Sequence, residues 1–158
     1  MKFLLQKATV LDINSDYHNQ TVDILIENGK VVQIGGNLKA KDAIVITSPN
    51  LHVSIGWMDI GVVATDPGLE YKETLETLRE VAASGGYTDI ATTPNTKPVV
   101  QDKSMIHYLK RGNTSSTVTI HPMAAVTQNC EGKDFTEMMD LQRAGAVAFT
   151  DGLNPLWN

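Results

Sequence analysis

The sequence predicts an α/β fold, the front part of a (β/α)8 TIM-type barrel preceded by a short all-β segment. Residues 1–54 contain short runs of β-type residues, whereas residues 55–158 alternate strand-like and helix-like segments with short links. Such alternation is typical of a parallel sheet. Four strands and three helices are too few to close a barrel of about 250 residues. A small open α/β sheet is the alternative, but the last strand lacks a covering helix.

The first segment is predicted to be all-β, with strands within 3–12, 22–34 and 43–48. Residues 22–34, VDILIENGKVVQI, predict a β-hairpin because two arms rich in Val and Ile flank Asn28-Gly29. Asn-Gly suits a two-residue turn, since both positions tolerate positive φ. A few short strands bury little apolar surface alone. We therefore expect this segment to pack on another part of the protein.

The second segment is predicted to contain strands at 57–63, 87–93, 117–122 and 146–150, which follow one another in chain order. Helices are predicted at 73–84, 103–111 and 135–143. In the first helix, the apolar periodicity places four residues on one face, namely Leu75, Leu78, Val81 and Ala82.

Local signals mark the ends of these helices. Asp102 is the expected N-cap of the second helix, and Asp134 with Glu137 has the spacing of a capping box before the third. Glycines at 85, 112 and 145 are expected to end the three helices.

Composition excludes several classes of protein. The chain has 158 residues, 42% of them hydrophobic, and a formal net charge of −5, which argues against a nucleic-acid-binding protein. Its apolar runs are too short to span a membrane. Cys130 is the single cysteine, so no internal disulfide forms, and no histidine nearby in sequence supports a nucleophilic role. We expect a cytoplasmic protein.

Three stretches between Ile55 and Gly152 resemble dihydroorotases of the amidohydrolase superfamily. They are GWMDIGVVATDPGLEYKETLETLREVAASGGYTDIATTPNTKPV, AAVTQNCEG and AGAVAFTDG. The first is similar to a family stretch that runs Gly-Phe-Ile-Asp-x-His-x-His-x-Arg-x-Pro-Gly and later Pro-Asn-Thr-x-Pro. The other two are similar to loops after the third and fourth barrel strands. The resemblance covers about two thirds of the chain, in order, and is that of an N-terminal portion of these enzymes. These enzymes flank the barrel with a small β-sandwich built partly from the N-terminus, so the resemblance implies that residues 1–54 are a β-sandwich segment.

The resemblance implies the interconversion of carbamoyl-aspartate and dihydroorotate in pyrimidine biosynthesis. Related hydantoinases and dihydropyrimidinases open similar cyclic amides. The family uses zinc at the C-terminal ends of the barrel strands, where a His-x-His pair on the first strand binds metal because residues i and i+2 point to the same side. Zinc acidifies its bound water into a nucleophile.

The sequence departs from this pattern at the first strand. Gly61 and Val63 stand where the two histidines are expected, and Thr65 stands where the family has an arginine that holds the substrate carboxylate. Glycine and valine cannot bind a metal, and threonine cannot make the bidentate contact of an arginine. We therefore expect no bound cofactor in this chain and no catalytic residue.

Three other positions remain candidates, each with a structural alternative. Asn95 matches a family asparagine that contacts substrate, and its alternative is a turn residue after Pro94. Asp151 matches a metal-bridging aspartate, and its alternative is an Asp-Gly turn. His121 lies at the end of the third strand as either a displaced metal ligand or an ordinary polar residue.

Three functional hypotheses remain open. The first is a catalytically impaired dihydroorotase homologue that acts as a structural partner of aspartate carbamoyltransferase or associates with itself. The remainder of the barrel is a further expected partner of this chain. The second is an active dihydroorotase with altered ligands. The third is another activity on the same frame, such as that of a hydantoinase.

Overall fold

The structure is a computed structural model that describes residues 1–156. Its chain divides into two compact units, Met1–Ile55 and Gly56–Asn158. The predicted α/β fold, with the first units of a TIM-type barrel after a β-rich segment, is confirmed. In the part of the chain that the structure describes, no helix is long and apolar enough to cross a membrane.

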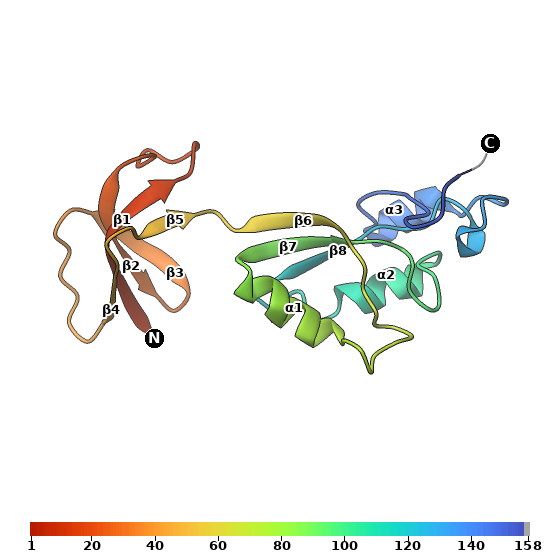
Figure 1. Ribbon diagram of the computed structural model, residues 1–158, viewed down its shortest axis with the longest axis horizontal. Coiled ribbons are helices and arrows are strands. Elements are labelled where there is room, and N and C mark those ends of the chain that lie inside the picture. Colours follow the sequence, from red (N-terminus) through yellow and green to blue (C-terminus); the bar gives the residue numbers. More distant parts are fainter. Residues whose placement is uncertain (157–158) are drawn as a thin grey trace. The chain divides into compact units, whose positions relative to one another are not determined.

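The first unit is a five-stranded sheet (Figure 1). Strands β1, β2 and β3 form an antiparallel meander, and β4 and β5 pair in parallel with successive parts of β1. The bounds are Lys2–Leu11, Thr21–Glu27, Lys30–Gly35, Ile44–Thr47 and His52–Ser54. The sequence had indicated all of these strands except β5.

The predicted Asn28-Gly29 turn is confirmed. It joins β2 directly to β3, and both residues have positive φ, 52° and 76°. Ala8, Val10, Val22 and Ile24 form the buried cluster of this unit.

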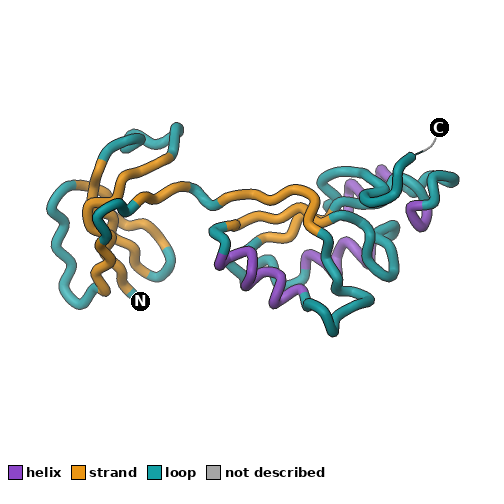
Figure 2. The backbone as a smooth tube through the Cα atoms, viewed as in Figure 1, coloured by secondary structure: helices purple, strands orange, loops and turns teal. Residues whose placement is uncertain are grey.

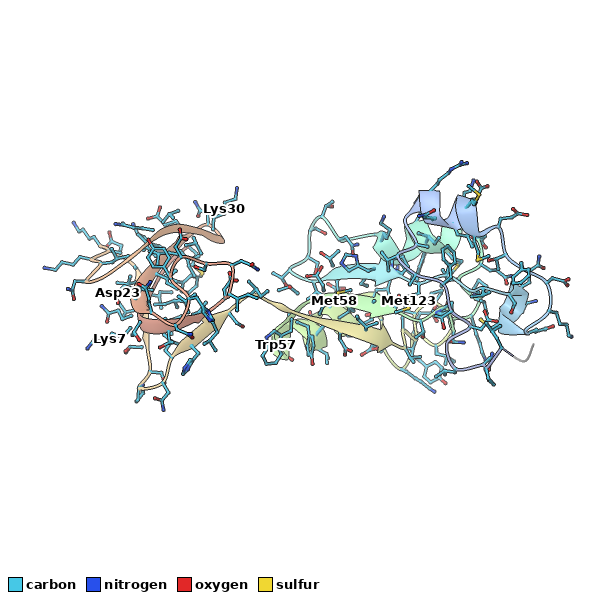
Figure 3. The ribbon with its side chains drawn as sticks, turned by 90° about the horizontal axis from the view of Figure 1, so that it is seen from above. Lys7, Asp23, Lys30, Trp57, Met58 and Met123 are labelled. Carbon is cyan, nitrogen blue, oxygen red and sulfur yellow. The ribbon has the colours of Figure 1, made fainter. Side chains whose placement is uncertain are left out.

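The Asp23 carboxylate is buried in this unit and accepts hydrogen bonds from the backbone N–H groups of Lys7 and Leu38, both at 2.9 Å (Figure 3). The edge strands β3 and β4 leave apolar side chains exposed, among them Val31, Val32, Ile44 and Val45.

The second unit contains a three-stranded parallel sheet in the order β6, β7, β8, with bounds Trp57–Val62, Tyr87–Thr92 and Thr119–Pro122. Helices α1 (Leu75–Ser84) and α2 (Lys103–Lys110) lie on one side of it (Figure 1). Ile90 and Ile120 of the sheet pack with Leu78 and Leu109 of the helices. After β8 the chain is mostly loop, interrupted by a 3-10 turn at Gln128–Cys130 and by α3, Met138–Ala144 (Figure 2).

The predicted fourth strand, 146–150, is wrong as a full strand. The segment runs parallel to the end of β8 but forms only one β-bridge, between Ala124 and Phe149. Three backbone hydrogen bonds hold it there, from Val147 to Pro122, from Ala124 to Ala148 and from Thr150 to Ala124. The pairing ends at Asp151, whose carboxylate is buried against the loop that contains Val126 and Thr127.

Two details of the helices also differ from the prediction. Val81 is 62% exposed, and Arg79 is buried on α1 in its place. Within the described residues, the predicted capping box before α3 does not form. The N-cap residue of α3 is Glu137, and its side chain makes no capping hydrogen bond. Residues 134–136 instead pair with 126–128 through backbone hydrogen bonds, which delays the start of the helix.

The predicted N-cap of α2 is confirmed, and it leads to a testable result. The Asp102 carboxylate accepts the Met105 N–H at 3.0 Å, and a hydrogen bond from Ser104 holds the pKa of Asp102 below its ordinary value. Asp102→Ala should therefore lower the free energy of unfolding by about 1 kcal/mol at neutral pH. A carboxyl group whose pKa is lower in the folded than in the unfolded protein stabilises the fold at pH values above its unfolded pKa. The difference in unfolding free energy between the two proteins should therefore shrink as the pH falls and Asp102 becomes protonated. Urea unfolding between pH 7 and pH 3 measures it, and a pH-independent difference would contradict the cap.

Candidate functional site at the strand ends

Asp151, the candidate metal ligand, follows the segment beside β8 and is 2% exposed. Its Oδ1 atom accepts two backbone hydrogen bonds, from Val126 and Thr127, each at 2.9 Å. Its Oδ2 atom accepts the Thr127 hydroxyl, which in turn accepts the Gly132 N–H at 2.8 Å. Both carboxylate oxygens are therefore engaged in holding the loop that follows β8.

Asn95, the candidate substrate contact, lies in the loop after β7 and holds the turn that contains Asp151. Its Nδ2 donates to the backbone oxygen of Asp151 at 3.1 Å, and its Oδ1 accepts the Leu153 N–H at 3.2 Å. Gly152, between them, has φ of 59°, and a Cβ there would lie 1.8 Å from Asn95 Oδ1. The structure thus brings the two candidates together, through backbone contacts.

The three positions that lack the family's functional residues lie at the end of β6 and in the loop after it. Gly61 has φ of 101° at an irregularity in the pairing of β6 with β7. Val63 is 42% exposed, so it does not pack within this chain as an inward-facing strand residue would. The Thr65 hydroxyl donates to the Glu73 backbone oxygen at 2.9 Å. Thr65 therefore ties the loop together just before α1.

The donor set does not fit a zinc ion. Within residues 1–156, no three side chains of His, Cys, Asp or Glu gather closely enough to hold a metal. A catalytic zinc needs about three protein ligands. Asp151, the residue that the resemblance assigns to the metal, already directs both oxygens to the 126–127 loop.

His121, the remaining candidate on the strands, pairs with an acidic residue that sequence reasoning missed. Its Nε2 lies 2.7 Å from Oδ1 of Asp89 on the neighbouring strand β7. The hydrogen bond with His121 comes first, and one from Thr88 second, among the causes that lower the pKa of Asp89. The available sequence signal was a polar residue within each of two predicted strands that follow one another in the chain. The register of these two strands, which only the structure gives, was needed to show that the two residues pair.

Cys130 is buried in the 3-10 turn after β8. Burial raises the pKa of its thiol to about 11, and the nearby Asp151 carboxylate adds to the effect. The thiol is therefore neutral at physiological pH, which makes it a poor nucleophile.

On the helix side of the sheet, Arg79 of α1 reaches the C-terminal end of α2. Its Nη2 donates to the backbone oxygens of Leu109 and Arg111, at 3.4 and 2.6 Å, and to Asn113 Oδ1 at 3.1 Å. A groove of about 810 Å³ lies alongside, with Asp66, Tyr108 and Arg111 in its wall. The lining of this groove includes none of the candidate residues Asn95, His121 and Asp151.

Comparison with known proteins places these features in a family. Residues 51–154 match the family model described as dihydro-orotase-like. The chain is 38% identical over 161 residues to a dihydroorotase of Syntrophus aciditrophicus, with 100% of this chain and 38% of that protein covered. It is 37% identical over 160 residues to a dihydroorotase of Geotalea daltonii, with 100% and 37% covered. The chain thus spans less than two fifths of the length of these curated relatives.

Solved structures agree on the fold. An L-hydantoinase from Arthrobacter aurescens superposes with a TM-score of 0.68 at 24% identity. The superposition covers 93% of this chain and 32% of the hydantoinase chain. A dihydroorotase structure superposes with a TM-score of 0.63 at 15% identity and covers 94% and 41%. The family model covers most of the chain, and the fold matches that of amidohydrolases. This chain belongs to the dihydro-orotase-like family.

Proposed function

We propose that this chain is part of a dihydroorotase-like protein of pyrimidine biosynthesis whose strand-end site is catalytically impaired. It acts as a structural partner, of the kind that assembles with aspartate carbamoyltransferase, or associates with itself. The main support is the position of the Asp151 carboxylate. A bridging ligand must direct its oxygens to metal ions, but both oxygens of Asp151 bind the 126–127 loop.

The substitutions on β6 add a second, independent support. Gly61 and Val63 offer no metal-binding atom where the family pattern has two imidazoles. Thr65 uses its hydroxyl within its own loop rather than presenting it to a ligand. The side chains that would bind zinc and the substrate carboxylate are thus replaced, while the neighbouring residues Pro67, Gly68 and Glu70 still follow the family pattern.

The alternative is an active dihydroorotase or a related cyclic amidohydrolase. Identity of 37–38% over the whole chain to proteins named dihydroorotase favours it. In such an enzyme the metal ligands would have to come from outside the residues described here. The compartment in which we expect either protein to work is the cytoplasm.

Metal content separates the two functions. We expect the intact purified protein to contain clearly substoichiometric zinc by elemental analysis and to lack chelator-sensitive cyclisation of carbamoyl-aspartate. A dihydroorotase with the complete His-x-His pair, purified in the same buffers, is the matched control for metal loss. Near-stoichiometric zinc together with turnover that a chelator abolishes would overturn the proposal.

A stable complex with the same organism's aspartate carbamoyltransferase, detected by light scattering, would support the partner role, and a lone monomer would contradict it.

A further inference from the structure

The groove that Arg79 lines has carboxylates on its α1 side. Glu76 and Glu80 line the groove four positions apart on this helix, and both are exposed. Within residues 1–156, neither carboxylate takes part in an ion pair. Like charges at this spacing repel each other and destabilise a helix. A cation bound beside both carboxylates would remove this repulsion.

Other residues of the groove present hydrogen-bond donors. They belong to the end of α2 and to the loop after it, and they are Arg111, Gly112, Ser115, Ser116 and Thr117. The Arg111 guanidinium lies over the Tyr108 ring, 4.0 Å from its centroid, and donates to the Tyr108 hydroxyl at 3.0 Å. It pairs with no carboxylate in the described part of the chain. An arginine has five N–H donors, so Arg111 retains donors for a further partner.

Arg79 itself has a donor without an acceptor. The side chain is 8% exposed, and its Nε atom has no hydrogen-bond partner within the described residues. A buried donor that lacks a partner costs free energy. Gly112 leaves space beside this guanidinium, because a Cβ atom at Gly112 would lie 3.5 Å from Arg79 Nη1 and the glycine has none. A ligand oxygen that enters this space would meet the guanidinium.

We propose that this groove binds a short segment of a partner protein, with a lysine or arginine of that segment beside Glu76 and Glu80 and its backbone carbonyl groups on Arg79 and Arg111. A peptide carries a cation and acceptor oxygens on one molecule, as the two kinds of lining require. An anion would be repelled by the carboxylates, and a simple cation would leave the arginine donors unused. The groove volume of about 810 Å³ is typical of ligand sites. No strand-end residue takes part, so the site is independent of the proposed function.

Two capped tripeptides test the site on the intact protein. The probe is acetyl-Gly-Arg-Gly-amide, and its matched control replaces the arginine by citrulline, which has nearly the same shape but no charge. We expect the arginine peptide to bind about fivefold more tightly at low salt, the worth of one exposed ion pair. Its carbonyl groups should shift the Arg79 Nε–H resonance saturably in ¹H–¹⁵N spectra, assigned through the side-chain carbons. Equal affinities for the two peptides, or an Nε–H resonance that does not move, would overturn the proposal.

A pair of double variants locates the charge that the arginine peptide meets. Glu76→Gln with Glu80→Gln should abolish the fivefold preference and leave the fold intact, because glutamine and glutamate have similar helix propensities. Glu131→Gln with Glu137→Gln is the matched control, since it removes the same charge from two exposed acids outside the groove lining. Far-UV circular dichroism checks that both proteins fold. An equal loss of preference in both would show only attraction to the net charge and would overturn the site, as would full preference in the first.

Discussion

Replacing Asp151 by alanine is expected to lower the free energy of unfolding by about 2–4 kcal/mol. The carboxylate is buried and accepts the N–H groups of Val126 and Thr127. Without it, two donors in the loop after β8 lose their partner in a place that water reaches poorly, and each unsatisfied donor costs about 1–3 kcal/mol. Urea unfolding of the intact protein, monitored by far-UV circular dichroism, measures the loss.

Two further variants show whether this loss reflects the loop contact. Asp151→Asn keeps an oxygen that can accept the two N–H groups, so it should retain much of the stability. Glu131→Gln, at an exposed acid in the same loop, should change little. If Asp151 bound a metal instead, a chelator would destabilise the unmodified protein as much as Asp151→Ala does. That outcome would refute the structural role assigned to the carboxylate.

Replacing Arg79 by alanine should also cost about 2–4 kcal/mol. The guanidinium is buried, and desolvation lowers its pKa, as does the charge of Arg111 to a smaller extent. Its Nη2 binds the last backbone oxygens of α2. The C-terminal end of a helix carries partial negative charge, so a buried cation there satisfies oxygens that α2 cannot pair itself. The variant should separate α1 from the end of α2.

A lysine at position 79 is the informative comparison. Its ammonium group has no planar fork that can reach several oxygens at once, so Arg79→Lys should recover only part of the stability. Glu80→Ala, at the next position on α1 and exposed, is the matched control for helix propensity. Chemical unfolding gives the three values. Equal stability of Arg79→Ala and the control would show that the contacts with α2 contribute nothing.

Much of the fold could be predicted from local sequence signals because those signals act over a few residues. Asn28-Gly29 tolerates positive φ at both turn positions, and Asp102 reaches the N–H of Met105 three residues later. Gly145 ends α3 with φ of 107°, a conformation that glycine adopts without strain. The order of the three parallel strands followed from the alternation of strands and helices. The family could be recognised for the same reason, since its motifs are short and lie in sequence order.

The sequence could not determine how the candidate side chains are used, because that depends on segments far apart in the chain. Asp151 and Thr127 meet across 24 residues, and Asn95 and Asp151 meet across 56. Arg79 is buried in preference to Val81 because the end of α2 supplies oxygens that a charged group needs and an apolar group does not. A carboxylate or guanidinium has few bonding directions. The sequence therefore determined which polar groups are present, whereas the tertiary structure decided which partners fill those directions.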